Sequence, residues 1–236
     1  MPIPTRALTA LVASAVAAIG VGVTAAPATA AVAQAAGCTA STSLPTRVSI
    51  DRAVQQVPIT LRTTCSADYA DAFLAGPDGD YDVPFWEAPL DGSTYLWEAY
   101  GDSTVPGTYR TEEIELYQGP DDLSPEGLTT TDGRAVAKFG SKAGLTAART
   151  GSRVTLTACA SYYNGRRDAF VPWSAHRATI QRLGADGRTW EYVKTVGTNA
   201  RGCAVLDVAA PVAATYRVTT YETYQIFSRT SPTVRA

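Results

Sequence analysis

Residue types that usually build catalytic and metal centres are scarce in this 236-residue chain, which contains a single histidine, His176. The four cysteines show no Cys-x-x-Cys spacing, so a zinc site of ordinary composition cannot be assembled. No Gly-x-Ser-x-Gly turn is present to hold a serine nucleophile for His176, which we expect on the surface or in a turn. The composition favours a protein that is not an enzyme and that needs no cofactor.

An excess of charge of either sign is also missing, since 20 Lys and Arg residues face 22 Asp and Glu residues. A basic protein surface that neutralises phosphates dominates the affinity of most nucleic-acid-binding proteins. The near balance of charge therefore excludes neither a protein nor a glycan partner, but it gives no support to nucleic acid or to an acidic membrane.

The chain lacks a membrane-spanning apolar run, although its first residues are apolar. Arg6 precedes an apolar stretch over 7–23, and the small residues Ala28-Thr29-Ala30 follow. This order is typical of a cleaved secretory signal, and Pro27 ends the run before the roughly 20 apolar residues of a spanning helix. We predict a signal peptide over 1–30; the alternative is a lipoprotein cut before Cys38.

In an exported chain, four cysteines favour two disulfides. Three pairings of Cys38, Cys65, Cys159 and Cys203 are compatible with the sequence, and locality favours Cys38 with Cys65 and Cys159 with Cys203. If Val154, Leu156 and Ala158 face a core, strand alternation turns Cys159 to the opposite face. The same argument on Ala204, Leu206 and Val208 turns Cys203 outward, so we expect a bridge across the outer surface of one sheet.

No segment holds a helical apolar period, whereas short alternating segments recur along the chain. Val57, Ile59 and Leu61 alternate with polar residues, and turn-forming residues separate such segments at intervals of roughly 8–12 residues. The polar stretch over 119–133 is rich in Gly, Pro, Asp and Thr. The sequence therefore predicts an all-β protein with a first module over 38–118, a linker over 119–133 and a second module over 134–236, whose last strands include one from Ile226 onward.

The second half resembles the immunoglobulin-like β-sandwich modules of secreted actinobacterial proteins. The residues that carry the resemblance are Lys138 to Ser141, Gly151 to Ala158, Pro172-Trp173, Ala178 to Arg182, Trp190 to Thr195 and Thr215 to Arg217. The first half is similar more loosely, through Ala75 to Pro77 and a second Thr-Tyr-Arg at Thr108 to Arg110. The resemblance implies two tandem immunoglobulin-like or fibronectin-III-like β-sandwiches and no shared catalytic activity. The cysteine pair of the second half is a departure from these modules.

Candidate ligand contacts are aromatic. Tyr162, Tyr163, Trp173, Tyr221 and Tyr224 would stack on sugar rings if they were exposed on one face of a sandwich. Tyr162 and Tyr163 are neighbours on a predicted strand, so we expect one of them to be exposed.

Acidic residues offer weaker candidates. Asp78, Asp80 and Asp82 follow the spacing at the start of a calcium-binding loop, but Val83 and Pro89 stand where the helix-loop-helix version needs Gly and Glu. An acidic turn is the favoured interpretation, and a looser calcium site is the alternative. We expect the adjacent Glu112 and Glu113 to point to opposite faces of a strand.

Taken together, these features predict a secreted or wall-associated, non-enzymatic protein that binds an extracellular protein or glycan. Two alternatives remain: a secreted enzyme or enzyme inhibitor with an unrecognised site, and a module that binds glycans or the cell wall. A catalytic site would gather His, Asp or Ser in one pocket, whereas a binding module would expose aromatic residues.

The small residues at Ala28 to Ala30 predict that the mature protein begins near Ala31. N-terminal sequencing of the protein from culture supernatant measures this directly. Recovery of a lipid-modified Cys38 from the membrane fraction would instead establish the lipoprotein alternative.

Overall fold

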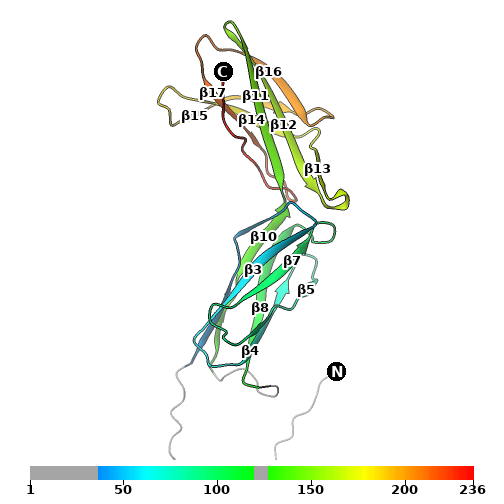
Figure 1. Ribbon diagram of the computed structural model, residues 1–236, viewed down its shortest axis with the longest axis vertical. Helices are drawn as coiled ribbons and strands as arrows, with labels where there is room; N and C mark the ends of the chain where they lie inside the picture. Colours follow the sequence, from blue (N-terminus) through cyan, green and yellow to red (C-terminus); the bar gives the residue numbers. More distant parts are fainter. Residues whose placement is uncertain (1–36, 120–126) are drawn as a thin grey trace, which may run out of the picture. The chain divides into compact units, whose positions relative to one another are not determined.

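The computed structural model describes residues 37–119 and 127–236, and the predicted signal peptide lies outside these residues. Strands make up the described chain, apart from loops and one 3-10 turn at Gly165–Arg167 (Figure 1). The prediction of an all-β protein is therefore confirmed. Within the described part of the chain, no helix has the length and apolar character needed to cross a membrane.

The first two sheets contain strands from the first 139 residues. One sheet has the order β7-β3-β1-β9, and its strands are β1 (Thr39–Ser43), β3 (Val54–Thr63), β7 (Thr94–Tyr100) and β9 (Thr129–Thr131). The other has the order β2-β10-β8-β4-β5 with β6 also paired to β4; its strands are β2 (Arg47–Ile50), β4 (Tyr69–Ala75), β5 (Tyr81–Asp82), β6 (Phe85–Glu87), β8 (Gly107–Tyr117) and β10 (Arg134–Phe139). Figure 1 shows β3 beside β7 in the first sheet.

A continuous apolar core lies between these two sheets. Val57, Ile59 and Leu61 of β3 are buried, as their alternation predicts, and they share the core with Leu74 of β4 and Leu116 of β8. Each fully buried aliphatic side chain contributes about 1.5–3 kcal/mol relative to exposure in water. The two-residue period of the strands therefore holds the sheets together.

The other two sheets contain strands from Ser141 onward. In one, β12 (Arg153–Asn164) pairs with β11 (Ser141–Thr150), β13 (Ala169–Pro172) and β16 (Cys203–Ala209). The other has the order β15-β14-β17-β18, with β14 (Arg177–Leu183), β15 (Trp190–Gly197), β17 (Thr215–Thr220) and β18 (Val234–Arg235). A second apolar core joins them, with Val154, Leu156, Ile180, Tyr216 and Val218 nearly inaccessible to solvent.

Two boundaries predicted from the sequence are wrong. Within the predicted linker, Thr129–Thr131 forms β9, which runs parallel to β1. Strand β10, assigned from the sequence to the second module, pairs with β8 and β2, and its Ala135 and Ala137 belong to the first core. The pairing of β10 with β2, far away in the sequence, leaves no local signal. Residues 120–126 of the predicted linker lie outside the described ones.

A single residue, Gly140, separates β10 from β11. Its N–H donates to the Ile50 carbonyl at 2.8 Å, and its own carbonyl accepts from the Tyr163 N–H at 2.8 Å. A Cβ at this position would lie 2.8 Å from the Ser49 hydroxyl oxygen. A larger residue at position 140 would therefore displace the Ser49 side chain where the chain leaves the first core.

The strand predicted from Ile226 onward is also wrong. Ile226 forms only an isolated parallel bridge with Phe139, and Thr230 forms another with Thr219. Regular pairing resumes at Val234–Arg235, after Pro232, which has no N–H to donate. Contacts with β10 and β17 therefore replace a strand in this segment.

The structure confirms the predicted cysteine pairing. Cys159 and Cys203 are direct partners in the register of β12 and β16, with Cα atoms 4.1 Å apart. The flanking Ala158 is buried, whereas both cysteines are partly exposed. The bridge therefore lies on the outer side of the sheet, as strand parity predicts.

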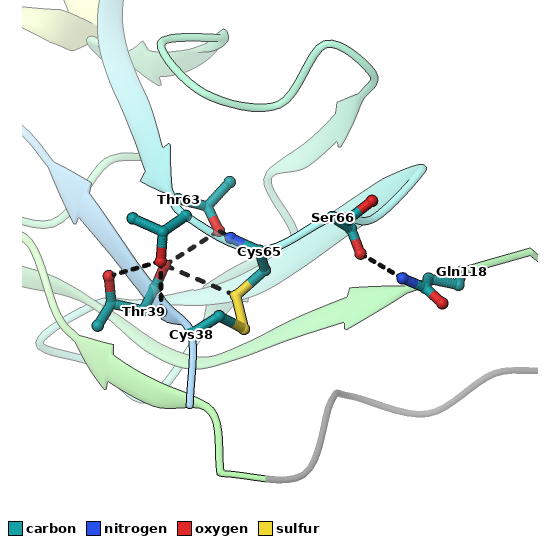
Figure 2. Close-up of a disulfide and its surroundings, with 7 residues drawn as sticks. Cys38, Thr39, Thr63, Cys65, Ser66 and Gln118 are labelled. Atoms are coloured by element: carbon teal, nitrogen blue, oxygen red, sulfur yellow. Dashed lines mark hydrogen bonds between the residues drawn. A yellow bond between two sulfur atoms is a disulfide. The ribbon is translucent and has the colours of Figure 1, made fainter. Parts of the chain in front are cut away.

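The other bridge joins Cys38 and Cys65, whose Cα atoms are 5.1 Å apart, beside the first strand (Figure 2). Hydrogen bonds support this end of the sheet: the Thr63 hydroxyl donates to the Thr39 carbonyl at 3.0 Å and accepts from the Cys65 N–H at 3.0 Å. The Gln118 amide donates to the Ser66 carbonyl close by. The bridge ties the start of β1 to the end of β3.

Replacement of Cys159 and Cys203 by serine should destabilise the protein by about 2–5 kcal/mol without changing its fold, because a bridge across 44 residues restricts the unfolded chain by about 4 kcal/mol. Denaturant unfolding and circular dichroism measure the two effects. Because the sulfurs lie outside the core, the loss should not exceed this entropic range; a collapse of the β-sheet spectrum would contradict the outer placement.

Candidate binding surface

Strand β4 presents an unusual alternation. Its inward residues are the small Ala70 and Ala72 followed by Leu74, whereas the outward ones are Tyr69, Asp71 and Phe73. Large aromatic side chains normally fill a core, so their placement on the solvent side of a strand calls for an explanation beyond folding.

Aromatic rings from neighbouring strands continue this surface. Phe85 of β6 stacks on Tyr69 with ring centroids 5.9 Å apart, and Tyr81 of β5 meets Phe73 edge to face at 5.2 Å. The four side chains are 36% to 67% exposed. Register partners on β8 and β6 add carboxylates between the rings. We call this surface the aromatic-acidic face; its residues are Tyr69, Asp71, Phe73, Tyr81, Phe85, Glu87, Glu112, Glu115 and Tyr117.

Two carboxylates oppose each other at the centre of the face. Asp71 and Glu115 are direct cross-strand partners, an arrangement that destabilises a sheet when both are ionised. The Tyr117 hydroxyl lies between them, donating to Glu115 and, at 3.5 Å, to Asp71. Partial burial and the charge of Glu115 raise the pKa of Asp71, and the Tyr117 hydrogen bond opposes this. The hydrogen bond to Glu115 is the main cause of a raised pKa for Tyr117.

A β-bulge disturbs the alternation on β8. Glu113 has a positive φ of 51°, and the pairing with β4 shifts register here. Both Glu112 and Glu113 lie between the buried Thr111 and Ile114, and neither is buried. The expectation that they point to opposite faces is therefore wrong at this bulge. Arg110 forms an ion pair with Glu112, so Arg110 offsets one charge of an otherwise acidic surface.

Three of the aromatic residues predicted as ligand contacts do not form a platform. Trp173 is 7% exposed and Tyr163 is 1% exposed, because both rings fill apolar clusters. The Tyr163 hydroxyl donates to Asp168 at 2.6 Å. Burial is the main cause, and this hydrogen bond the second, of a pKa of Tyr163 raised to about 12. Tyr162 is half-buried beside Trp173. As predicted, only one of the adjacent tyrosines is buried.

The other two predicted aromatics are exposed, Tyr221 at 43% and Tyr224 at 69%. They do not gather into one patch by direct ring contact: the Tyr221 hydroxyl lies 3.0 Å from the Thr179 hydroxyl, whereas the Tyr224 hydroxyl lies beside Gly107. Of the predicted set, Tyr221 is therefore the ring that lies among other polar groups suited to a ligand.

The acidic turn holds its carboxylates in local bonds. Asp78 accepts from the Asp80 N–H, and Asp82 accepts from the Val83 N–H at 2.9 Å and from the Tyr95 hydroxyl at 3.4 Å. Across residues 37–119 and 127–236, no three His, Cys, Asp or Glu side chains gather as a metal site would require. These local bonds fit the favoured interpretation of an acidic turn, and Asp78, Asp80 and Asp82 are not gathered as the alternative calcium site would require.

The sequence predicts His176 on the surface or in a turn; it is buried, directly after the turn at Ser174 and Ala175. Its ring stacks on Trp173 with centroids 3.4 Å apart, and its Nε2 lies 3.0 Å from the Tyr221 carbonyl. Burial lowers the pKa of His176, and the contact with this carbonyl opposes the shift. A stacking role against Trp173 accounts for this histidine.

The aromatic-acidic face was not predicted from the sequence, although one signal is visible there. Two sets of residues alternate in the run from Tyr69 to Leu74: the even positions are Ala, Ala and Leu, and the odd ones are Tyr, Asp and Phe. Both sets contain apolar residues, so the pattern does not show which set is buried. The small alanines mark the inward set, because they leave room in the core for larger rings from other strands, such as Trp86, the register partner of Ala70.

Comparisons with known proteins assign no family. No protein-family model matches the chain, and a search of curated proteins finds no match. Among solved structures, the chain is similar to the tetra-tandem repeat in the extending region of a large adhesion protein, with 13% identity and a TM-score of 0.32. That match covers 85% of this chain and 49% of the other, so the chain spans about half the length of that structure.

Two further structures are similar at the same low level. The human OSCAR ligand-binding domain gives 14% identity and a TM-score of 0.29, covering 82% of this chain and 97% of that one. A β-glycosidase from Bacteroides vulgatus gives 9% identity and a TM-score of 0.24, covering 84% and 25%. Similarity at this level assigns neither a family nor a function.

The contacts of Asp71 predict opposite effects of two substitutions on its pKa. Glu115→Gln removes a neighbouring negative charge and should lower the pKa of Asp71, although partial burial keeps it above its ordinary value. Tyr117→Phe removes the hydrogen bond that favours the ionised form and should raise it further. Carboxyl NMR titration measures both shifts.

Asp186 serves as the control residue. Hydrogen bonds from Thr189 and Arg188 lower the pKa of Asp186 to about 2, and neither substitution alters these bonds. Because the pKa of Asp71 is raised in the folded state, ionisation of Asp71 destabilises the folded protein relative to the unfolded chain at neutral pH. Glu115→Gln should therefore stabilise the protein at neutral pH, by about 0.2–1 kcal/mol, and the gain should vanish as the pH falls below the pKa of Asp71. Shifts of equal sign in the two variants would contradict this arrangement.

Proposed function

We propose that this chain is a secreted, non-enzymatic interaction protein built of two tandem immunoglobulin-like sandwiches. The partner we propose is an extracellular protein whose contact surface carries Arg or Lys among apolar residues. The observation that carries the proposal is the aromatic-acidic face, in which exposed rings lie among carboxylates, of which Glu112 is ion-paired with Arg110.

The topology of the first two sheets supports an immunoglobulin-like module. The order β2-β10-β8-β4-β5 faces the order β7-β3-β1, as the two sheets of a variable-type domain do. Tyr109 near the start of β8 donates from its hydroxyl to the Val105 carbonyl at 2.9 Å, four residues upstream. This bond has the form of the tyrosine corner found in such domains.

The remaining sheets support a second module of the same kind. The sheet of β11, β12, β13 and β16 faces the sheet of β15, β14, β17 and β18. The repeated Thr-Tyr-Arg falls on β8 and on β17, and each of these strands pairs antiparallel with an earlier strand of its own sheet, β8 with β4 and β17 with β14. Its tyrosines, Tyr109 and Tyr216, are both buried. The pairing of β10 with β8 and β2 supports β10 as the last strand of the first module, so that the second module begins after Gly140.

The two disulfides point to an extracellular or secreted protein, because such bonds persist in oxidising compartments. Wall association is part of the proposal and rests on the predicted secretion alone. The same bridges lie on the two sides of Gly140 in sequence, so each proposed module carries one.

The chemistry of the aromatic-acidic face favours a protein partner. Interfaces are enriched in aromatic residues, and buried aromatic anchors with Arg dominate their binding energy. Phe73 and Phe85 have no polar group to offer a sugar, whereas their edges and faces suit apolar and guanidinium groups. A cationic partner would also relieve the repulsion between Asp71 and Glu115.

Catalysis by the same carboxylates is the competing hypothesis. Glycoside hydrolysis needs two carboxyl groups that face each other across a bound sugar, about 5–10 Å apart. Asp71 and Glu115 instead stand side by side on one open sheet face, joined through Tyr117. The geometry therefore favours recognition over hydrolysis, and activity on glycosides that disappears in Glu115→Gln would reverse this choice.

Photo-crosslinking from the face tests the proposal. A benzophenone amino acid replaces Phe85 in the mature protein, which is irradiated with the extracellular protein fraction, and crosslinked peptides are identified by mass spectrometry. We expect one dominant partner, crosslinked next to Arg or Lys residues. Binding of that purified partner should weaken about tenfold or more in Phe73→Ala, and with a rise in NaCl from about 0.05 to about 0.5 M.

The matched control places the same photo-reactive residue at Leu96, which is 49% exposed on β7 of the opposite sheet. Leu96→Ala likewise serves as the control for Phe73→Ala. Equal crosslinking from positions 85 and 96, or a partner whose binding ignores both Phe73→Ala and salt, would refute the proposed face.

A further inference from the structure

A row of four threonines crosses the outer side of the last sheet. Thr195 of β15 pairs with Thr179 of β14, Thr179 pairs with Thr219 of β17, and Thr219 bridges to Thr230. Neighbouring hydroxyls lie 3.2 Å apart in the Thr179 and Thr195 pair and 2.9 Å apart in the Thr219 and Thr230 pair. We call these residues the threonine row.

The hydroxyls of the row are held in place by one another and by an aromatic ring. The Tyr221 hydroxyl lies 3.0 Å from that of Thr179 and 3.5 Å from that of Thr195. Each hydroxyl can donate one hydrogen bond and accept two, so a mutual bond leaves capacity for a ligand. The row is therefore a preorganised array that can both donate and accept.

Planar polar groups lie next to the row. The Arg217 Nε–H donates to Gln181 at 2.9 Å, and the guanidinium lies 4.0 Å from the centre of the Trp190 ring. A shallow recess of about 430 Å³ is lined by Gln181, Arg217, Tyr221 and three threonines of the row, Thr179, Thr219 and Thr230. Tyr192, the register partner of Gln181, is 67% exposed at the same sheet face.

We infer that this recess is a carbohydrate-binding site, distinct from the aromatic-acidic face and independent of the proposed protein partner. Saccharides present closely spaced hydroxyls that donate and accept together, which matches the threonine row. Apolar C–H faces of the sugar ring suit the exposed Tyr192 and Tyr221 rings. No carboxylate lines the recess, whereas Arg217 does, so a neutral sugar or one that carries a carboxylate fits its charge.

Titration of the full mature protein with a soluble β-glucan and with polygalacturonate tests the site. The double substitution Thr179→Val and Thr219→Val keeps the β-branched shape of both residues but removes their hydroxyls. It should weaken binding about tenfold or more, the loss expected for one or two hydrogen bonds. If polygalacturonate is the better ligand, Arg217→Gln should weaken its binding alone; equal loss for both sugars would assign Arg217 to hydroxyl contacts.

Thr60→Val is the matched control, since Thr60 forms a similar hydroxyl pair with Thr94, 3.2 Å apart, on a sheet outside the recess. Thermal melting shows whether each variant is folded, and Tyr221→Phe, which removes a single hydroxyl, gives a milder second test. Failure of the native protein to bind either polysaccharide would overturn the inference. Equal affinity of the row variant and Thr60→Val would overturn it as well.

The outcome separates this inference from the proposed function. Crosslinking through Phe85 requires no sugar, so it should persist in the row variant. If the row variant instead abolishes capture of the protein partner while neither polysaccharide binds, the recess belongs to a protein interface and the carbohydrate site is refuted.

Discussion

Pairing of β10 with β8 on one side and β2 on the other organises the whole chain. It closes the first core with Ala135 and Ala137, and it brings the chain to Gly140 with no residues to spare. The chain must then start β11 at once, at a position already fixed by β10. The pairing of β10 with β8 and β2 therefore fixes the residue at which the second pair of sheets begins.

Strand parity was readable from the sequence wherever one face of a strand is plainly apolar. The alternation of Val154, Leu156 and Ala158 correctly turned Cys159 outward, and the same logic placed Val57, Ile59 and Leu61 in a core. It failed where both faces carry apolar residues, as on β4, and where a bulge adds a residue, as at Glu113. Period alone does not choose between two apolar faces; on β4 the choice depends on larger side chains from other strands, such as Trp86 beside Ala70.

Long-range pairing accounts for the other failures. The residues near Thr129–Thr131 do not indicate that the partner strand is β1, about ninety residues upstream. Nor do the residues near Ile226 indicate its bridge to Phe139. Likewise Trp173, Tyr163 and His176 looked like surface candidates, yet they fill space between segments that are distant in the sequence. The exposed aromatic residues that matter most, Phe73 and Phe85, occur in the half of the chain with the weaker family resemblance.

The two candidate surfaces differ in the physics of recognition. The aromatic-acidic face combines apolar area with negative charge, which suits a partner with basic side chains. The threonine row offers no net negative charge and many small hydroxyl groups at fixed spacing, which suits a ligand of similar hydrogen-bonding character. The two surfaces belong to different sheets and share no residue.

Tyr163 couples the two cores. It lies on β12, yet its ring packs in the first core, where a Cβ at Gly101 would lie 2.8 Å from it. A Cβ at Gly165 would overlap the Gly101 carbonyl, so the two backbones meet without any side chain between them. Local melting of the sheet that contains β12 would withdraw this ring and leave a void beside Gly101. Unfolding of the second core would therefore destabilise the first. We expect the two cores to unfold in one cooperative transition and not independently.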